Sequence, residues 1–163
     1  LAVLELSKPL RIIEKIPNIE DWYISGHSLG GIAALSAVSN EPERFKGLIL
    51  LGTYPSESFA ISDWDHSVLS IYAENDGLST PAEVLAASSF LPEAKMLTNI
   101  VDLDTLSTEP AITLYHEILG GNHAQFGNYG AQNGDGVATI STEQQHIIIH
   151  EMIMAFIDWN EDE

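Results

Sequence analysis

Apolar and polar stretches alternate along the chain in blocks that predict strands and helices in turn. The continuous apolar run at 47–51 is closed by Gly52, which is typical of a buried parallel strand. The run at 68–73 predicts another strand and is followed by a polar turn that contains Gly77. Shorter runs at 22–25 and 112–119 predict two further strands, because each is rich in β-branched or aromatic residues and ends near a glycine. The pattern therefore predicts four strands.

Helical signals fill most of the sequence between these runs. A Ser-Lys-Pro start with Ser7 as its cap and a stop at Pro17 frame the first predicted helix. A small-residue helix is predicted to begin at Leu29, a capped helix at Thr80 and a last amphipathic helix at Ser141. Strands that alternate with helices predict an α/β fold, with a mostly parallel sheet flanked by helices. The acidic tail 160–163 is expected to fray.

The rest of the pattern predicts a single domain. The segment 96–110 fits the alternation poorly, and we expect either a loop insertion or an extra helical turn there. Neither an internal repeat nor an interdomain linker is visible. The longest aliphatic run, 48–51, is far shorter than the roughly 20 residues that span a bilayer, so no transmembrane segment is expected in this portion. A soluble, by default cytoplasmic, protein is expected unless a signal or anchor lies upstream of Leu1.

Composition excludes several classes of partner and site. Six basic against 24 acidic residues give a formal net charge of −18, which repels phosphate backbones and makes nucleic acid an unsuitable partner. The 45% apolar content is enough to build a core, so wholesale disorder is not expected. The sequence contains no cysteine, which removes disulfides, zinc–thiolate sites and cysteine nucleophiles together. No metal or cofactor is predicted, and the oligomeric state is left open.

The strongest chemical motif is Gly26-His27-Ser28-Leu29-Gly30, which matches Gly-x-Ser-x-Gly. It follows a predicted strand and opens a small-residue helix, the setting that a nucleophile elbow requires. A sharp turn of this kind holds the serine backbone under strain, and Gly26 and Gly30 are expected to permit the close approach. The backbone N–H of Leu29 is the expected oxyanion donor, and His27 is expected to point away from Ser28 and support the turn. The alternative is an ordinary glycine-rich turn that opens a helix.

A serine nucleophile needs a base that is held by a third group. Asp76 follows the predicted strand 68–73, and His123 follows the predicted strand 112–119. The carboxyl ends of parallel strands share one edge of the sheet, so both side chains are expected beside Ser28. Asp76 has the alternative role of a turn or cap residue, and His123 that of a hydrogen-bonded loop histidine.

Other residues compete for these roles less well. Three further acidic residues are rival candidates for the acid: Glu74, Asp102 and Asp104. His66 precedes a predicted strand and His116 lies inside one. His146 and His150 are one helical turn apart, a spacing that can bind metal, but no third ligand is evident nearby, so they are interpreted as a helix face.

With these residues in place, the sequence resembles the serine α/β-hydrolase superfamily, in its esterase and dienelactone-hydrolase-like branch. The resemblance rests on the elbow 26–31, on Asp76-Gly77, on the run 120–130 and on Trp22-Tyr23-Ile24. It covers nearly the whole chain and is weakest over 96–110. It implies the α/β-hydrolase fold, with Ser28, Asp76 and His123 as nucleophile, acid and base. Dienelactone hydrolases carry a cysteine nucleophile, so that specific activity is not expected.

The resemblance also implies that 1–163 is an N-terminally truncated, partial domain. It would run from the helix before the nucleophile strand to the C-terminal helix. Such hydrolases have about eight strands, with the elbow after the fifth, whereas here the elbow comes at residue 28. The loop that supplies the second oxyanion donor is therefore expected to lie outside this sequence. The stretch 53–67 is too short for a separate cap domain, which predicts an open site where Tyr54, Phe59 and Trp64 either line the pocket or pack on the surface.

The resulting hypothesis is a serine hydrolase that acts on a small carboxylic ester through an acyl-enzyme. One alternative is an acyltransferase that uses the same three residues. Another is a non-catalytic binding protein of this fold, or an inactive fragment of the enzyme.

Overall fold

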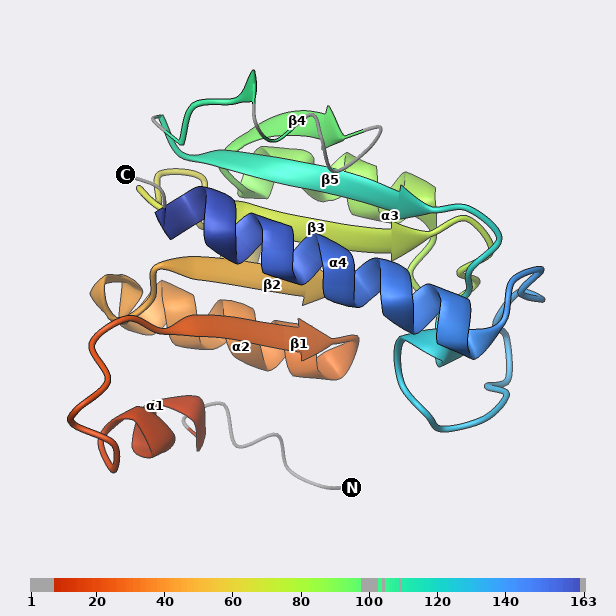
Figure 1. Ribbon diagram of the computed structural model, residues 1–163, viewed down its shortest axis with the longest axis horizontal. Helices are drawn as coiled ribbons and strands as arrows, with labels where there is room; N and C mark the ends of the chain where they lie inside the picture. Colours follow the sequence, from red (N-terminus) through yellow and green to blue (C-terminus); the bar gives the residue numbers. More distant parts are fainter. Residues whose placement is uncertain (1–7, 98–102, 104, 109, 162–163) are drawn as a thin grey trace.

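The computed structural model describes residues 8–97, 103, 105–108 and 110–161. Its centre is a five-stranded sheet in which every neighbouring pair is parallel (Figure 1). The spatial order is β1-β2-β3-β5-β4, with bounds β1 Tyr23–His27, β2 Gly47–Leu51, β3 Val68–Ala73, β4 Glu93–Leu97 and β5 Ile112–Ile118. The sheet confirms the predicted α/β class with its mostly parallel strands.

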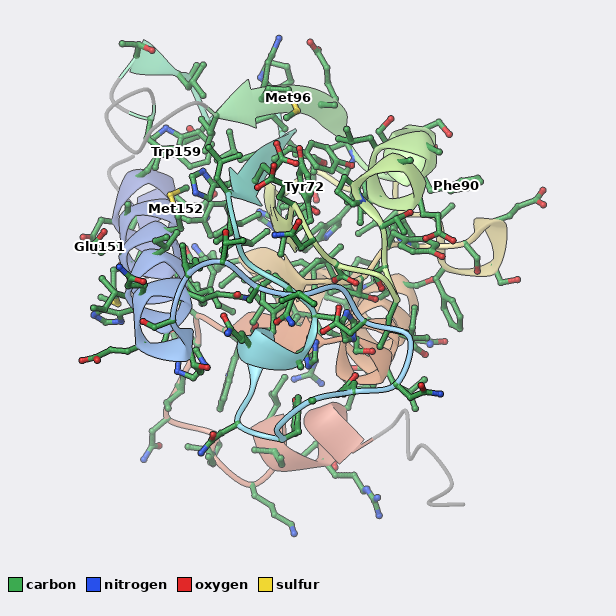
Figure 2. All side chains as sticks on the ribbon, turned by 90° about the vertical axis from the view of Figure 1, so that its right-hand side faces the viewer. Tyr72, Phe90, Met96, Glu151, Met152 and Trp159 are labelled. Atoms are coloured by element: carbon green, nitrogen blue, oxygen red, sulfur yellow. The ribbon has the colours of Figure 1, made fainter. Side chains whose placement is uncertain are left out.

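Helices cover both faces of this sheet, which makes three layers (Figures 1 and 2). α2 and α3 lie on one face, and α4 runs across the other. α1 packs against α2 beside the β1 edge. The α-helices are α1 Lys8–Ile13, α2 Leu29–Asn40, α3 Pro81–Ala86 and α4 Thr142–Glu161, and short 3₁₀ turns are η1 Pro42–Arg44, η2 Glu57–Phe59, η3 Ala87–Phe90 and η5 Ala124–Phe126.

The two hydrophobic cores explain why the central strands contain continuous apolar runs. Successive side chains of a strand point to opposite faces. In β2, Leu48 and Leu50 therefore join the core beneath α2 and α3, whereas Ile49 joins the core beneath α4. Phe156 of α4 is fully buried in that second core. Both faces need apolar residues, which is why the sequence predicted β2 and β3 with their observed bounds.

Two helix starts have the caps that their sequences predict. Thr80 and Glu83 form a reciprocal capping box at α3, with Glu83 N–H donating to Thr80 Oγ1 and Thr80 N–H donating to the Glu83 carboxylate. At α4, Ser141 and Gln144 make the corresponding pair of hydrogen bonds. α1 ends at Ile13, earlier than the stop expected from Pro17, and Ser7 lies outside the described residues.

Two expectations about the ends of elements were wrong. The sequence 93–97 forms a fifth strand, β4, on the edge of the sheet, where a loop or helical turn was expected from 96 onward. The tail does not fray at Asn160, because α4 continues through Glu161 and Asn160 Nδ2 donates to the Tyr23 hydroxyl and to Lys46 O. No helix in the described ranges is long and apolar enough to cross a membrane.

Candidate active site

The predicted site residues gather at the carboxyl edge of the sheet, the edge that faces the viewer in Figure 2. Ser28 follows β1, Gly52 follows β2, Asp76 follows β3 and His123 follows β5 after a short turn. The segment between β5 and α4 passes in front of this edge and contributes His123 (Figure 2). Parallel strands thus bring together residues that are about 50 positions apart in the sequence.

Ser28 has the backbone strain that its motif predicts. Its φ of 52° and ψ of −121° make it the only non-glycine residue with positive φ in the described part of the chain. This conformation is costly for a residue with a Cβ and persists only where neighbours enforce it. Here Ser28 N–H donates to Leu51 O at 3.0 Å, and Ser28 O accepts from Gly31 N at 2.9 Å. The turn leads directly into α2, so Leu29 N–H lies at the positive end of a helix.

The glycines around Ser28 are not equally necessary. A Cβ on Gly26 would lie 2.2 Å from Gly30 O, and one on Gly31 would lie 2.2 Å from Cγ2 of Thr53. A Cβ on Gly30 would meet no heavy atom within 4 Å in the described structure. A close approach was expected at both motif glycines. Of these two, the structure requires glycine only at Gly26, which packs against the backbone of Gly30.

His123 and Asp76 form a buried pair. Nδ1 of His123 lies 2.8 Å from Oδ2 of Asp76, and the side chains are 2% and 0% exposed. The other carboxylate oxygen of Asp76, Oδ1, accepts from the N–H groups of Leu78 and Ser79 at 2.8 and 2.7 Å. An acceptor at Nδ1 favours the tautomer that protonates this nitrogen and leaves Nε2 free to accept a proton.

Two residues that sequence reasoning missed lie next to this pair or to the loop that carries it. Gln145 of α4 is fully buried, and its amide makes two hydrogen bonds to the backbone of Asn122, one from Asn122 N–H and one to Asn122 O. Gly52 has a φ of +52°, and a Cβ there would lie 3.1 Å from Oδ2 of Asp76. The signal for Gly52 was its position directly after a buried strand, whereas a buried glutamine on an amphipathic helix carries no distinctive pattern.

A third missed residue, Asp135, lies in the loop between His123 and α4. Its carboxylate accepts backbone hydrogen bonds from both the Asp76 turn and the His123 loop. Nothing in the sequence analysis had singled out Asp135.

His27 lies against the candidate base. Its ring centroid is 4.5 Å from that of His123, and the ring also stacks on Phe126 and Tyr129. Nδ1 of His27 is hydrogen-bonded to the Tyr129 hydroxyl at 2.9 Å, whereas Nε2 is buried without a partner. Burial, together with the nearby His123, lowers the pKa of His27 to about 4. The sequence predicted His27 as support for the turn, and the contact of its ring with His123 was not expected.

Ser28 is at the same sheet edge as the pair but is not bonded to it. No hydrogen bond joins Ser28 Oγ to His123 among the residues that the structure describes. Catalytic hydrogen bonds are often long or absent until substrate binds. The rival acid Glu74 accepts from Gly120 N–H at 2.8 Å and thereby closes the turn after β5. The other two rivals, Asp102 and Asp104, lie outside the described residues.

The remaining histidines have other surroundings. His66 lies near Asp65 and against the Trp64 ring, and burial lowers the pKa of His116 within β5. His146 and His150 are exposed on α4. Over the described ranges, no three His, Asp or Glu residues are arranged so that they could hold a metal ion.

Comparison with known proteins agrees with this architecture. A family model described as the alpha/beta hydrolase family matches residues 1–147. A search of curated proteins found no match.

Solved structures share the fold at low sequence identity. A protein from Thermoplasma acidophilum that is described as a predicted CIB-like hydrolase is 13% identical with a TM-score of 0.60, over 95% of this chain and 58% of that protein. A thermostable esterase is 19% identical with a TM-score of 0.55, over 95% of this chain and 36% of that one. Naproxen esterase from Bacillus subtilis is 15% identical with a TM-score of 0.58, over 93% and 65% of the two chains.

The present chain thus spans between about a third and two thirds of the length of these structures. At such low identity, the structural similarity supports the fold and no particular activity. The assignment to a family rests on the family model. The chain belongs to the alpha/beta hydrolase family.

Proposed function

We propose that this hydrolase acts on carboxylic esters through Ser28, with His123 as general base and Asp76 as its orienting acid. The observation that carries the proposal is the strained Ser28 at a strand-to-helix turn, on the same sheet edge as a buried His–Asp pair. A serine held on such a turn becomes a nucleophile when a base can remove its proton. That His123 Nδ1 is hydrogen-bonded to Asp76 leaves Nε2 available for this role.

The proposed reaction has two halves. Ser28 Oγ attacks the ester carbonyl while its proton passes to Nε2 of His123, and the tetrahedral intermediate collapses as His123 returns that proton to the departing alkoxide. Water then attacks the acyl-enzyme, again with His123 as base, and releases the carboxylic acid. Leu29 N–H, at the start of α2, would donate to the oxyanion. Asp76 stabilises the imidazolium that forms in both halves.

The connection after β2 favours small or accessible esters. Between Gly52 and Ser67 the structure contains only the 3₁₀ turn η2, with no helical cap. Of the aromatic residues expected there, Trp64 is buried and donates to Pro42 O, at the end of α2 opposite Ser28. It therefore packs in the core rather than beside the nucleophile. We infer a preference for short acyl chains, which a comparison of p-nitrophenyl acetate with p-nitrophenyl palmitate tests.

The activity itself is tested with p-nitrophenyl acetate and the variant Ser28→Ala. We expect the wild-type chain to hydrolyse the ester and the variant to lose at least about 10³-fold in kcat. Ser39→Ala, at the exposed far end of α2, is the matched control and should retain full activity. Equal rates for wild type and Ser28→Ala would overturn the proposal. Product analysis with an added alcohol distinguishes transfer to water from transfer to that alcohol.

A further inference from the structure

The carboxylate of Asp135 hydrogen-bonds both to the turn that carries Asp76 and to the loop that carries His123. It lies in the segment that links η5 to α4, twelve residues after His123. Oδ1 accepts from Gly77 N at 3.1 Å, His123 N at 3.2 Å and Gly136 N at 2.8 Å, and Oδ2 accepts from Ala124 N at 2.8 Å. One carboxylate thus serves four backbone donors from three stretches of chain.

The positions of these donors matter more than their number. Gly77 directly follows Asp76, and one of the other donors is the backbone N–H of His123 itself. An ionised carboxylate accepts on both oxygens and bonds more strongly than a neutral group, so it suits a point where several N–H groups converge. Hydrogen bonds to the Asp135 carboxylate thus connect the two loops that carry His123 and Asp76.

Close backbone packing around Asp135 also holds it near Asp76, in addition to these hydrogen bonds. A Cβ on Gly77 would lie 2.3 Å from Gly134 O, and a Cβ on Gly136 would lie 2.0 Å from Asn75 O. The chain on both sides of Asp135 therefore lies directly against the chain on both sides of Asp76. Only glycine permits that approach at these two positions, and it leaves the Asp135 carboxylate little freedom to move relative to Asp76.

We propose that Asp135 is a positioning residue, which sets the placement of His123 relative to Asp76 and so keeps the imidazole in the tautomer that can accept a proton from Ser28. The expected effect on catalysis rests on the proposed function. The expected effect on the position and tautomer of His123 does not depend on it. The hydrogen bonds of Asp135 in the described structure come only from backbone N–H groups, so we expect it to act through the two loops rather than on the substrate.

The test compares Asp135→Asn with Asp158→Asn. Asn at 135 keeps the shape and one acceptor oxygen but loses the charge and replaces the second acceptor with an NH₂ group. Asp158 is exposed on α4, so Asp158→Asn removes the same charge without a described contact. Each variant is measured for kcat and KM with p-nitrophenyl acetate, for thermal unfolding, and for the His123 tautomer by its ring ¹⁵N chemical shifts, with His123→Gln used to assign the signals.

For Asp135→Asn we expect kcat to fall by roughly 10²-fold with KM changed less than about 3-fold, because a small misplacement of a catalytic group costs about this much. The fraction of His123 with a proton on Nδ1 should fall as well, and Asp158→Asn should match wild type in every respect. A folded Asp135→Asn protein with wild-type kcat and tautomer would overturn the proposal, even if its melting temperature were lower.

The tautomer measurement needs no substrate, so it separates two possible failures. If the wild type shows no Ser28-dependent hydrolysis, the proposed function fails, and the ¹⁵N shifts still decide whether Asp135 positions His123. Asp135→Asn is used rather than Asp135→Ala because it keeps the shape of the side chain, so the protein is more able to fold.

Discussion

The two carboxylate oxygens of Asp76 have different partners, and only one of them faces His123. Oδ2 lies 2.8 Å from His123 Nδ1, while Oδ1 is occupied by the N–H groups of Leu78 and Ser79. The two backbone hydrogen bonds to Oδ1 therefore fix the rotation of the carboxylate, with Oδ2 directed at the imidazole. Since both side chains are buried, no solvent competes for the bond.

Replacement of Asp76 by Asn is predicted to abolish most of the activity without loss of the fold. The amide oxygen can keep the two N–H bonds of Oδ1, which turns the NH₂ group toward His123 Nδ1. This nitrogen must then accept, so the proton moves to Nε2 and the imidazole can no longer act as base. We expect kcat for p-nitrophenyl acetate to fall by about 10⁴-fold.

The control for Asp76→Asn is Glu74→Gln, since Glu74 is the nearby rival acid. Gln at this position still accepts from Gly120 N–H, so activity should stay within a few-fold of wild type. A larger loss of kcat in Glu74→Gln than in Asp76→Asn would assign the acid to Glu74 instead.

The two motif glycines are predicted to respond differently to alanine. Gly26→Ala places a methyl group 2.2 Å from Gly30 O, a backbone atom that cannot turn aside, so the unfolding free energy should fall by about 2 kcal/mol or more. Gly30→Ala adds a methyl group with no neighbour in α2 and should leave stability unchanged or raise it by about 0.5 kcal/mol. Urea unfolding measures both, and equal destabilisation by the two variants would contradict the packing described.

His27 is predicted to make stability depend on pH below neutrality. Its pKa is about 4 in the folded chain against an ordinary 6.5, so the unfolded chain binds more protons between these values. The stability that neutral His27 contributes is complete above pH 6.5 and is lost as the pH falls toward 4. Between pH 7.5 and 5 we expect wild type to lose about 2 kcal/mol more than His27→Gln, which cannot titrate.

The matched control for this pH effect is His146→Gln, which removes an exposed histidine of α4. Its loss of stability between pH 7.5 and 5 should equal that of wild type, as followed by urea unfolding at each pH. If His27→Gln and wild type lose the same amount, His27 is already protonated in the folded chain at pH 5.

Gln145→Leu is predicted to destabilise the loop that carries His123. Leucine fills the same buried space, but it leaves the N–H and the C=O of Asn122 without the partners that Gln145 supplies. Unsatisfied buried groups cost about 1–3 kcal/mol each, so the unfolding free energy should fall by about 2 kcal/mol or more. Gln132→Met, in the loop and without a described side-chain bond, should change it by less than about 0.5 kcal/mol. Equal effects would mean that Gln145 does not hold the loop.

The sequence predicted those parts of the fold that are buried on both sides. β2 and β3 are mostly apolar along their whole length because each lies between two cores. β4 gave no such run: in its sequence Glu-Ala-Lys-Met-Leu only Leu97 is buried, since the strand forms an edge of the sheet. β1 forms the other edge of the described sheet and was predicted, because its sequence is rich in aromatic and β-branched residues.

The same distinction separates the site residues that were predicted from those that were missed. Ser28, Asp76 and His123 carry reactive side chains within a few residues of the ends of strands, where residue type and position together are informative. Asp135 and Gln145 act on main-chain N–H and C=O groups, which every residue type provides, so no spacing in the sequence identifies their partners. Gly30, by contrast, belongs to the sequence motif, but a Cβ there would meet no other atom within 4 Å in the described structure.

The most direct test of the central claim is covalent labelling of the proposed nucleophile. The chain is treated with a fluorophosphonate, digested, and analysed by mass spectrometry for the modified residue. The proposed site predicts one adduct, on Ser28, which is absent from Ser28→Ala and strongly slowed in His123→Gln, while Ser39→Ala labels at the wild-type rate. A wild-type chain that is labelled elsewhere, or labelled equally with and without Ser28, would contradict Ser28 as the nucleophile.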